Sequence, residues 1–375
     1  MTLRPLRIVF LVQGEGRGHL SQALALAELL ENAGHEVVCV LAGTSERRPL
    51  PDYFSRGLGQ QVITFPSLLT VPGGAGTGVS MWRTVAVNTR RIFLYRNGIR
   101  LVRKILSRLQ PDLVVNFYEA LGAMALGAGG LERIPMVCVG HQYLLGHPGA
   151  PRPPFRPVQL LPFRVLNRLS VPSGAVRAAL SFRELPDLRD RGLEVIPPLL
   201  RKSVLEARPE PGEHLLVYVL NHGYGRAIAR WHESHPEIVI HGFWDRPGAP
   251  DTEVVRPNLT FHQLSDTRFM EFMRTCRGFV GTAGFESVAE ALWLGKPVMV
   301  VPTEKHVEQA WNGREAVAAG AGICRDSFDL TPFLDYLPQH RDVSPVYRDW
   351  VRRGHGKLVR LLERMATGTS PMNPN

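Results

Sequence analysis

Residues 278–301 have the pattern of a β-α-β unit, which constrains the fold more than any other segment. An apolar strand pattern at 278–281 leads into a turn around Gly284. A run with apolar residues at helical spacing follows, and then a Gly-Lys-Pro turn and the buried-strand pattern VMVVP. Two strands joined by one helix in this way predict an α/β fold built on a parallel sheet.

The start of the helix in this unit is suited to binding an anion. Its first turn offers free backbone N–H groups at Gly284, Phe285 and Glu286, and Ser287 adds a hydroxyl group. The positive end of the helix dipole lies at the same place. Because the first turn of a helix commonly binds phosphate groups, the segment predicts a phosphate-bearing ligand.

The amino terminus has a second β-α-β pattern. A buried-strand run, LRIVFLV, leads into the Gly-rich loop QGEGRGH, an amphipathic helix, Gly34 as its C-cap and another strand. Gly14, Gly16 and Gly18 approach the G-x-G-x-x-G fingerprint of dinucleotide-binding folds. That interpretation fails because the third Gly position is His19, and because the second strand ends without an acidic residue for an adenosine ribose.

Strand and helix patterns alternate along the chain in two series, separated by a linker-like segment at 198–213. Expected strands lie at 7–12, 36–42, 62–65, 113–117, 135–140, 194–197, 215–220, 238–242, 259–262, 278–281 and 297–301. Expected helices lie at 19–33, 80–109, 119–129 and 343–366. We therefore predict an α/β protein with two tandem Rossmann-like domains that face each other across a cleft, the expected place for an active site.

Composition fits a protein of this class. At 375 residues the chain exceeds what one hydrophobic core usually serves. The four cysteines are widely spaced without any C-x-x-C motif, which predicts reduced thiols in a cytoplasmic protein rather than zinc ligands or disulfides. The apolar run at 8–12 is too short for the core of a signal peptide, and no later segment is apolar enough to span a bilayer.

The residues after position 281 resemble the donor-site signature of UDP-sugar glycosyltransferases with the GT-B fold. The resemblance covers the small-molecule glucuronosyl and glucosyl transferases and the cell-wall family that adds N-acetylglucosamine to a lipid-linked muramyl peptide. In that signature a Gly-x-x-Ser turn holds the diphosphate, a Glu three residues later binds the ribose hydroxyls, and an acidic-Gln pair binds the sugar. The matching residues are Gly284, Ser287, Glu290, Glu308 and Gln309.

Two positions in this donor segment differ from the plant and animal version of the signature. Thr282 stands where a His is expected, followed by Ala283, and Glu286 stands where an Asn is expected before the Ser. Glu286 brings a negative charge close to the expected diphosphate site. We include Thr282 and Ala283 among the expected donor-binding residues.

The resemblance also implies a catalytic base, because the corresponding amino-terminal loop ends in Gly-His and the His is the base in many members. His19 takes that position. Members that use this His orient it with an Asp at the end of a later strand, where the segment PDLVVNFYE has Asn116. Asn116 can fix the imidazole tautomer but cannot stabilise its positive charge, so Glu119 and His141 are alternative partners. The expected acceptor loop comprises Gly16, Arg17 and Gly18.

Three further segments match the donor side of the family more loosely. The strand at 215–220 ends in a Gly-containing turn that faces the diphosphate in the resembling enzymes, and a plain strand-to-helix turn is the alternative. Arg201 follows two prolines, close to the sequence position that the phosphate-binding Arg occupies in the cell-wall family. The segment TFHQL resembles the one that pairs with uracil through its backbone, with Phe261 near the ring, although a buried aromatic is the commoner explanation for a single Phe. The residues concerned are Gly223, Gly225, Arg201, Phe261 and Leu264.

The resemblance implies a transfer that requires no metal. An acceptor hydroxyl attacks the anomeric carbon of the UDP-sugar, His19 removes its proton, and UDP leaves with inversion. The D-x-D motif that holds a metal in many other glycosyltransferases does not occur in the sequence. Two helix starts and Arg201 are expected to neutralise the diphosphate, each dipole contact contributing roughly 0.3–2 kcal/mol. We expect a UDP-sugar co-substrate and no metal or other cofactor.

Two other interpretations stay open at the level of sequence. A UDP-sugar epimerase can use the same scaffold, but it needs acid and base carboxylates around the cleft, and no clear set is apparent. A binding protein that keeps the nucleotide site without turnover is compatible with Thr282, Glu286 and Asn116. The sequence identifies neither the donated sugar nor the acceptor.

The formal net charge of the chain is +10, and the positive excess is uneven. No Asp or Glu occurs between Asp52 and Asp112, and basic residues alternate with apolar ones through 80–108. A solvated helix packed on a sheet has this pattern, and so does a helix that contacts an anionic membrane. No base-reading module accompanies the charge, so nucleic acid is not an expected partner. In the resembling cell-wall family the amino-terminal domain carries the acceptor and meets an anionic membrane. By this resemblance we predict a cytoplasmic protein with a peripheral contact at the inner face of the membrane through 80–108, and a lipid-linked or otherwise amphipathic acceptor.

By the same resemblance, the predicted acceptor domain spans 1–200 and the predicted donor domain spans 201–342. A helix at 343–367 is expected to pack back on the first domain. The tail at 368–375 is expected to be disordered.

Overall fold

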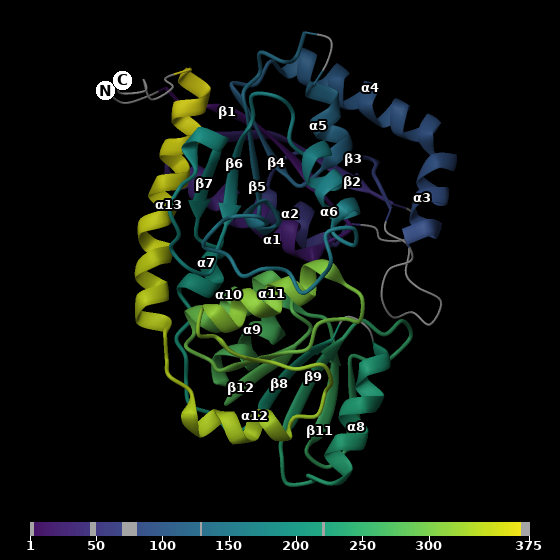
Figure 1. Ribbon diagram of the computed structural model, residues 1–375, viewed down its shortest axis with the longest axis vertical. Helices are drawn as coiled ribbons and strands as arrows, with labels where there is room; N and C mark the ends of the chain where they lie inside the picture. The colour runs from purple at the N-terminus through teal and green to yellow at the C-terminus, as the bar shows by residue number, and fades with distance from the viewer. Residues whose placement is uncertain (1–3, 46–49, 70–80, 128–129, 220–221, 369–375) are drawn as a thin grey trace.

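The chain is built around two seven-stranded sheets, one from each half of the sequence (Figure 1). The computed structural model describes residues 4–45, 50–69, 81–127, 130–219 and 222–368. The tail for which disorder was predicted falls outside these ranges from residue 369 onward. The prediction of two α/β sheets with flanking helices is confirmed.

The first sheet is entirely parallel, with the strand order β3-β2-β1-β4-β5-β6-β7. The side chains of Ile8–Val12 in β1 are completely buried because helices cover both faces of the sheet, which explains the continuous apolar run. The strands are β1 (Arg7–Gln13), β2 (Glu36–Thr44), β3 (Val62–Pro66), β4 (Leu113–Phe117), β5 (Met136–Gly140), β6 (Val176–Leu180) and β7 (Leu193–Ile196).

The predicted helix at 80–109 is two helices in the structure. Helix α3 ends at Arg90 and α4 begins at Ile92, because Arg91 has φ −97° and ψ 9°, outside the helical region. Tyr95, Gly98, Val102 and Leu106 place the buried face of α4 on the sheet. The helices of this half are α1 (Arg17–Asn32), α2 (Asp52–Leu58), α3 (Met81–Arg90), α4 (Ile92–Leu109), α5 (Ala120–Leu126) and α6 (Leu161–Leu169).

The second sheet has the order β10-β11-β9-β8-β12-β13-β14 and is parallel except for the β10–β11 pair. Its strands are β8 (Leu215–Val219), β9 (Ile240–Trp244), β10 (Thr252–Arg256), β11 (Leu259–Gln263), β12 (Gly278–Gly281), β13 (Val298–Val300) and β14 (Gly322–Cys324). Its helices are α8 (Gly225–Glu233), α9 (Asp266–Thr275), α10 (Phe285–Trp293), α11 (Val307–Ala318) and α12 (Thr331–Tyr336). The expected linker at 198–213 contains the short helix α7 (Lys202–Leu205).

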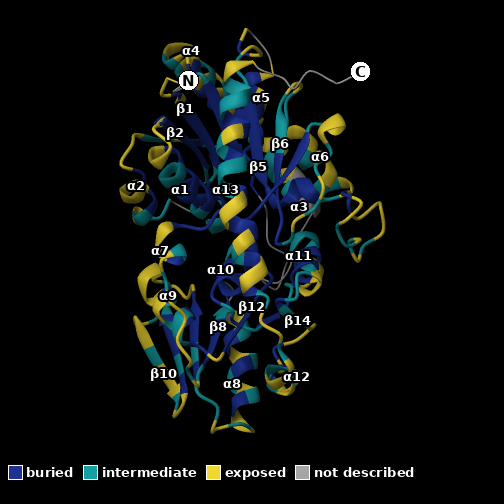
Figure 2. Cartoon of the chain, turned by 90° about the vertical axis from the view of Figure 1, so that its left-hand side faces the viewer, coloured by how far each residue is buried: buried dark blue, intermediate teal, exposed yellow. Residues whose placement is uncertain are grey.

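The last helix, α13 (Ser344–Thr367), contacts β4, β5 and β7 of the first sheet as well as α10 of the second half. Figure 2 shows it running along the molecule with buried and exposed residues alternating. Gly354 permits a close approach, since a Cβ there would lie 2.1 Å from Cδ of Pro197. Trp350 adds a hydrogen bond of 3.1 Å from its indole N–H to the carbonyl of Ser181.

The strand orders place two crevices opposite each other. In the first sheet the order reverses between β1 and β4, and in the second between β8 and β12. Open α/β sheets bind ligands at such switch points, beyond the carboxyl ends of the strands. The loops that follow β1, β4 and β12 are therefore the places in which to look for a site.

Candidate functional site

The loop after β1 is fixed by close backbone contacts. The N–H of Gly14 donates to the carbonyl of Gly43 at 2.8 Å, and a Cβ at Gly14 would lie 2.7 Å from the same oxygen. Gly16 is the N-cap of α1, and its N–H donates to Oε1 of Gln13 at 3.2 Å. This geometry places His19 in the first turn of α1, where its side chain is buried.

The His19 imidazole has two defined neighbours. Its Nδ1 lies 3.3 Å from Oε1 of Gln22, one helical turn later, and its ring stacks on Tyr118 with centroids 5.6 Å apart. Burial lowers the pKa of His19 to about 4, and the hydrogen bond with Gln22 opposes this shift only in part. The imidazole is therefore neutral at pH 7 and carries a lone pair, as a general base must.

The structure corrects the partner expected for His19. Both polar ends of the Asn116 side chain are engaged elsewhere: Nδ2 donates to the carbonyl of Ser170 at 2.8 Å, and Oδ1 accepts from the N–H of Glu119 at 2.9 Å. Asn116 holds the turn after β4 together, and Gln22 is the residue that contacts the imidazole. The sequence analysis did not predict Gln22, which lies in a helix, because the resemblance to the family placed the partner of His19 at the end of a strand.

The other two alternative partners are also placed elsewhere. The carboxylate of Glu119 is fully buried and accepts a hydrogen bond of 2.8 Å from the hydroxyl of Ser67. His141 lies in an aromatic stack, 4.2 Å from Phe285 and 4.6 Å from Trp311 by ring centroids, and its Nδ1 is 2.8 Å from the carbonyl of Leu180. Burial raises the pKa of Glu119 to about 7 and lowers that of His141 to about 4.

Helix α10 begins at the opposite crevice. Gly284 is its N-cap, without a hydrogen bond from a capping side chain, so that the first turn keeps backbone donors for a ligand. The hydroxyl of Ser287 lies 3.5 Å from the carbonyl of Gly284. Thr282 and Ala283 are buried, and the carbonyl of Ala283 accepts a hydrogen bond of 3.0 Å from Nδ2 of Asn312.

Arg201 and Glu290 were both predicted to bind the donor, and the structure brings them together. Nη2 of Arg201 donates to Oε1 of Glu290 at 3.2 Å, and Nη1 pairs with Asp266. The Nε atom of Arg201 is buried without a hydrogen-bond partner among the described residues. Burial raises the pKa of Glu290 to about 7, although the neighbouring guanidinium opposes the shift.

Glu286 joins the two halves of the molecule. Its Oε1 accepts a hydrogen bond of 2.7 Å from Nε2 of Gln22, and a Cβ at Gly18 would lie 3.3 Å from its Cγ. Burial and the nearby carboxylate of Glu290 raise the pKa of Glu286 to about 8. The acceptor-side loop and the start of α10 are therefore in direct contact.

The acidic-Gln pair lies at the start of α11. Oε1 of Glu308 accepts a hydrogen bond of 3.0 Å from Nε2 of Gln142, a residue of the first half, and burial raises the pKa of Glu308 to about 7. Oε1 of Gln309 accepts from the N–H of Thr303 at 2.8 Å. Glu308 thus contacts the first half of the molecule, and Gln309 follows it in the first turn of α11.

Residues 6–338 match the protein family described as Glycosyl transferase family 1. The chain belongs to this family. An uncharacterized glycosyltransferase of Methanosarcina acetivorans is 24% identical, with 93% of each chain covered. The UDP-N-acetylglucosamine--N-acetylmuramyl-(pentapeptide) pyrophosphoryl-undecaprenol N-acetylglucosamine transferase of Erythrobacter litoralis is 26% identical, with 86% of this chain and 78% of the relative covered.

Solved glycosyltransferases have the same fold. The kitacinnamycin glycotransferase has a TM-score of 0.64 at 17% identity, with 96% of this chain and 99% of the other covered. MurG of Acinetobacter baumannii has a TM-score of 0.59 at 16% identity, with 96% and 100% covered. The predictions of a GT-B fold and of a glycosyltransferase are confirmed.

The looser donor-side predictions have mixed outcomes in this glycosyltransferase. The ring of Phe261 is 1% exposed and stacks on Trp244 at 4.1 Å, as a core residue does, and the expected backbone contact of this segment with uracil stays a prediction. Leu264 packs at the edge of the core, and a Cβ at Gly225 would lie 2.7 Å from the Trp244 ring. Gly223 is exposed, in the turn before α8.

Two residues near His19 were missed by sequence reasoning. Gln22 follows His19 by three positions, a spacing that places both on one face of a helix and that was available in the sequence. Tyr118 has a φ of 60°, which is unusual for a residue other than Gly, and no sequence signal predicted it.

Arg17, in the expected acceptor loop, lies 3.6 Å from the carboxylate of Asp245 in the second half.

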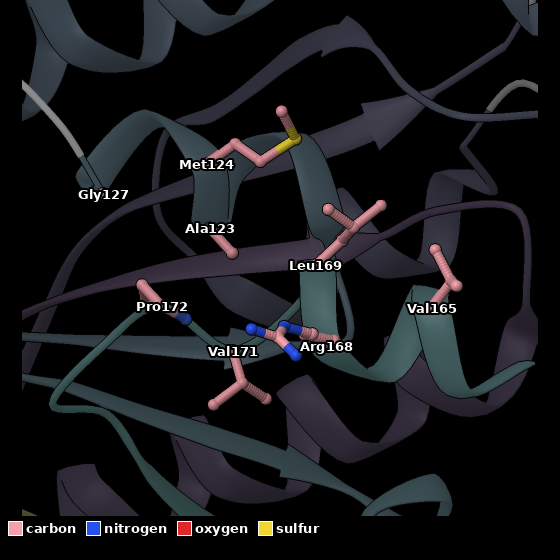
Figure 3. A pocket seen from close by; sticks show the side chains of 8 residues that line it. All are labelled: Ala123, Met124, Gly127, Val165, Arg168, Leu169, Val171 and Pro172. Carbon is pink, nitrogen blue, oxygen red and sulfur yellow. The ribbon is translucent and has the colours of Figure 1, made fainter.

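The surface of the glycosyltransferase has a shallow apolar hollow of about 380 Å³ between α5 and α6. Figure 3 shows its lining, with the guanidinium of Arg168 among apolar side chains. The lining residues are Ala123, Met124, Gly127, Val165, Arg168, Leu169, Val171 and Pro172.

None of the described helices combines the length and the apolar character needed to cross a bilayer. In the same residues, no three His, Cys, Asp or Glu side chains gather in an arrangement able to hold a metal ion.

Proposed function

We propose that this glycosyltransferase moves a hexose from a UDP-sugar to an acceptor hydroxyl, with inversion and without a metal. One observation carries the proposal: the first turn of α1, which bears His19, meets the start of α10 across the junction of the two sheets. A base on one side and an anion-binding helix start on the other are the two parts that an in-line transfer requires.

His19 is the proposed base. Its Nε2 accepts the proton of the acceptor hydroxyl while the oxygen forms a bond to the anomeric carbon. The bond from that carbon to the diphosphate oxygen breaks, and the electron pair leaves with UDP. Because burial keeps the imidazole neutral, His19 is able to accept this proton at neutral pH.

The start of α10 is the proposed diphosphate site. Its free N–H groups and the hydroxyl of Ser287 are suited to phosphate oxygens, and Arg201 adds a guanidinium whose Nε is available. Each charge-assisted hydrogen bond contributes about 1.5–3 kcal/mol. Several such contacts together can stabilise the leaving diphosphate in place of a metal ion.

Glu290, Glu308 and Gln309 are the proposed contacts for the ribose and the hexose. Carboxylates accept hydrogen bonds from vicinal hydroxyl groups, and Glu290 lies one helical turn beyond Ser287 on the same face of α10. Glu308 contacts the first half from the start of α11, and Gln309 is its neighbour in the chain. Glu290 now pairs with Arg201, and Glu308 with Gln142. A bound donor would share these hydrogen bonds or replace them.

The proposed acceptor is lipid-linked or amphipathic, and the proposed membrane contact is the outer face of α4 with neighbouring α5 and α6. Figure 1 shows α4 on the side of the first sheet away from α13. Helix α5 contacts both α4 and α6, and α6 has no buried residue. The exposed apolar side chains of this face are Ile92, Phe93, Leu94, Leu101, Met124, Val158, Leu161, Val165 and Leu169.

Basic residues accompany these apolar side chains. Arg96 lies over the Phe93 ring at 5.9 Å, and Arg100 is also exposed on α4. Each such residue near an anionic surface contributes about 1 kcal/mol. The name of the Erythrobacter litoralis relative specifies a lipid-linked acceptor, which supports the same substrate class for this chain. We propose that the contact lies at the inner face of the membrane.

Incubation with a panel of UDP-sugars, without and with candidate acceptors, tests the proposal. We expect slow release of UDP without an acceptor and faster release with a polyprenyl-linked or amphipathic one, followed by mass spectrometry. Formation of an epimer of the donor would instead identify an epimerase. Binding of the donor without any change would identify a non-catalytic protein.

A further inference from the structure

A chain of side-chain hydrogen bonds runs from His19 across the junction of the two sheets. Nδ1 of His19 lies 3.3 Å from Oε1 of Gln22, and Nε2 of Gln22 donates to Oε1 of Glu286 at 2.7 Å. His19 and Gln22 belong to α1, whereas Glu286 belongs to α10. His19 and Gln22 are buried and Glu286 is half-buried, so most of the chain is shielded from water.

The chemistry of the three groups gives this chain a direction. When Glu286 is ionised, its carboxylate only accepts hydrogen bonds, so the amide nitrogen of Gln22 must face it. The amide oxygen of Gln22 then faces His19, and Nδ1 must be the nitrogen that carries the hydrogen. The lone pair of the imidazole is left on Nε2, which is the atom that a general base uses.

We propose that Gln22 and Glu286 are positioning residues that hold His19 in the tautomer of a base. The inference rests on the proposed role of His19. Because Glu286 is supplied by the donor-side half, the base is set only when that half is closed onto α1. The start of the donor site and the orientation of the base are thereby coupled through one hydrogen bond.

The ionisation state of Glu286 decides which way the Gln22 amide faces, and four groups surround this carboxyl group. The groups that face it are Gln22 from α1, Glu290 from its own helix, Arg201 from the start of α7 and Tyr347 from α13. The Tyr347 hydroxyl is buried without a hydrogen-bond partner among the described residues. A protonated Glu286 could donate to a flipped Gln22 amide, which would place the hydrogen on the wrong imidazole nitrogen.

Exchanging the two groups tests the proposal. Gln22→Glu puts two carboxyl groups face to face, which hold one proton between them, so the group beside Nδ1 no longer only accepts; Glu286→Gln leaves two amides without a fixed direction. We expect each single variant to lower kcat by about 10- to 100-fold while UDP affinity stays within about threefold. The double variant Gln22→Glu/Glu286→Gln restores one acceptor facing Nδ1, and we expect kcat within about fivefold of the native value.

Two readouts separate this role from a merely structural one. The native enzyme should gain kcat as pH rises toward 8, and Glu286→Gln should lose this rise. Above pH 8, where Glu286 is ionised, nitrogen-15 NMR of labelled histidine should show His19 protonated at Nδ1 in the native protein and a mixture of tautomers in Glu286→Gln. Arg314→Ala, which removes an exposed hydrogen bond to Arg152 between the halves, is the control and should change neither.

The outcomes distinguish the positioning role of Gln22 and Glu286 from the role of His19 as the base. Native kcat, pH profile and tautomer in both single variants would overturn the positioning role, as would losses that simply add in the double variant. If His19→Ala is inactive in that case, the base assignment survives. If His19→Ala has native activity, the proposed function of His19 itself is wrong.

Discussion

Gln22 in helix α1 donates a hydrogen bond of 2.7 Å to Glu286 in helix α10, although 264 positions separate them in the chain. The bond connects the loop after the first strand to the helix start that is proposed to hold the diphosphate. Glu286 occupies a position where the family signature has an Asn. Its carboxylate has a partner here that the signature does not require, so the departure is accommodated by Gln22.

The first prediction concerns the base. His19→Ala removes the group proposed to accept the acceptor proton and leaves the start of α10 intact. We expect kcat to fall by roughly 10²–10⁴, with UDP affinity nearly unchanged. Steady-state kinetics and calorimetry measure the two quantities separately, and an unchanged kcat would assign the base to another residue.

The second prediction concerns a buried carboxyl group. Burial raises the pKa of Glu119 to about 7 in the folded protein, against an ordinary value of 4.5. Below pH 4.5 the group is protonated in both states. Between about pH 4.5 and pH 7 the unfolded state loses this proton while the folded state keeps it, so the free energy of unfolding falls across that window and levels off above it.

Glu119→Gln removes this effect. The free energy of unfolding of the variant, relative to the native protein, should therefore rise between pH 5 and pH 8 by on the order of 3 kcal/mol. Urea denaturation at the two pH values measures it. Glu36→Gln changes an exposed carboxylate and is the control. Parallel pH dependence in the native protein and Glu119→Gln would contradict the prediction.

The third prediction concerns packing of the last helix. Gly354→Ala places a methyl group against Pro197, where the ideal Cβ would lie 2.1 Å from Cδ. We expect a loss of stability of about 1–3 kcal/mol. Gly356→Ala is the matched control, because its Cβ would meet only the flexible end of Arg360 at 3.2 Å. A higher melting temperature for Gly354→Ala than for Gly356→Ala would show that α13 packs differently.

The fourth prediction concerns the membrane. Anionic vesicles should co-sediment the protein at low salt, and reversal of the charges at Arg96, Arg100 and Arg103 should weaken binding. Equal recovery in the supernatant with and without anionic vesicles would exclude the contact. The same number of reversals at exposed positions of the other half should leave binding intact. These control positions are Arg208, Arg226 and Arg230.

Sequence patterns predicted the sheets well where burial is uniform. The apolar run of β1 identifies a strand covered on both faces, and the β-α-β unit around α10 was visible in full. Strands β6, β10 and β14 were missed. Strand β6, VRAAL, has only one β-branched residue, β10 is a partly exposed edge strand, and β14 has three residues.

Contacts between the halves could not be predicted, because they depend on how two sheets dock. Sequence spacing could have paired His19 with Gln22, which lie one turn apart. Nothing in the sequence pairs Gln22 with Glu286 or Gln142 with Glu308. The break at Arg91 was missed because the apolar spacing of α4 continues through it. For Phe261 the sequence left two interpretations open, because a buried aromatic and a base-contacting one have the same local pattern.

The central claim is that the start of α10 and Glu290 form a donor site for a UDP-sugar that needs no metal. Calorimetric titration with UDP in the presence of EDTA tests it most directly, on the native protein, on Glu290→Gln and on the exposed control Glu304→Gln. We predict that the native protein and the control bind UDP equally, and that Glu290→Gln binds it more weakly by about 1.5–3 kcal/mol. Absence of binding in EDTA, or native affinity in Glu290→Gln, would contradict the account.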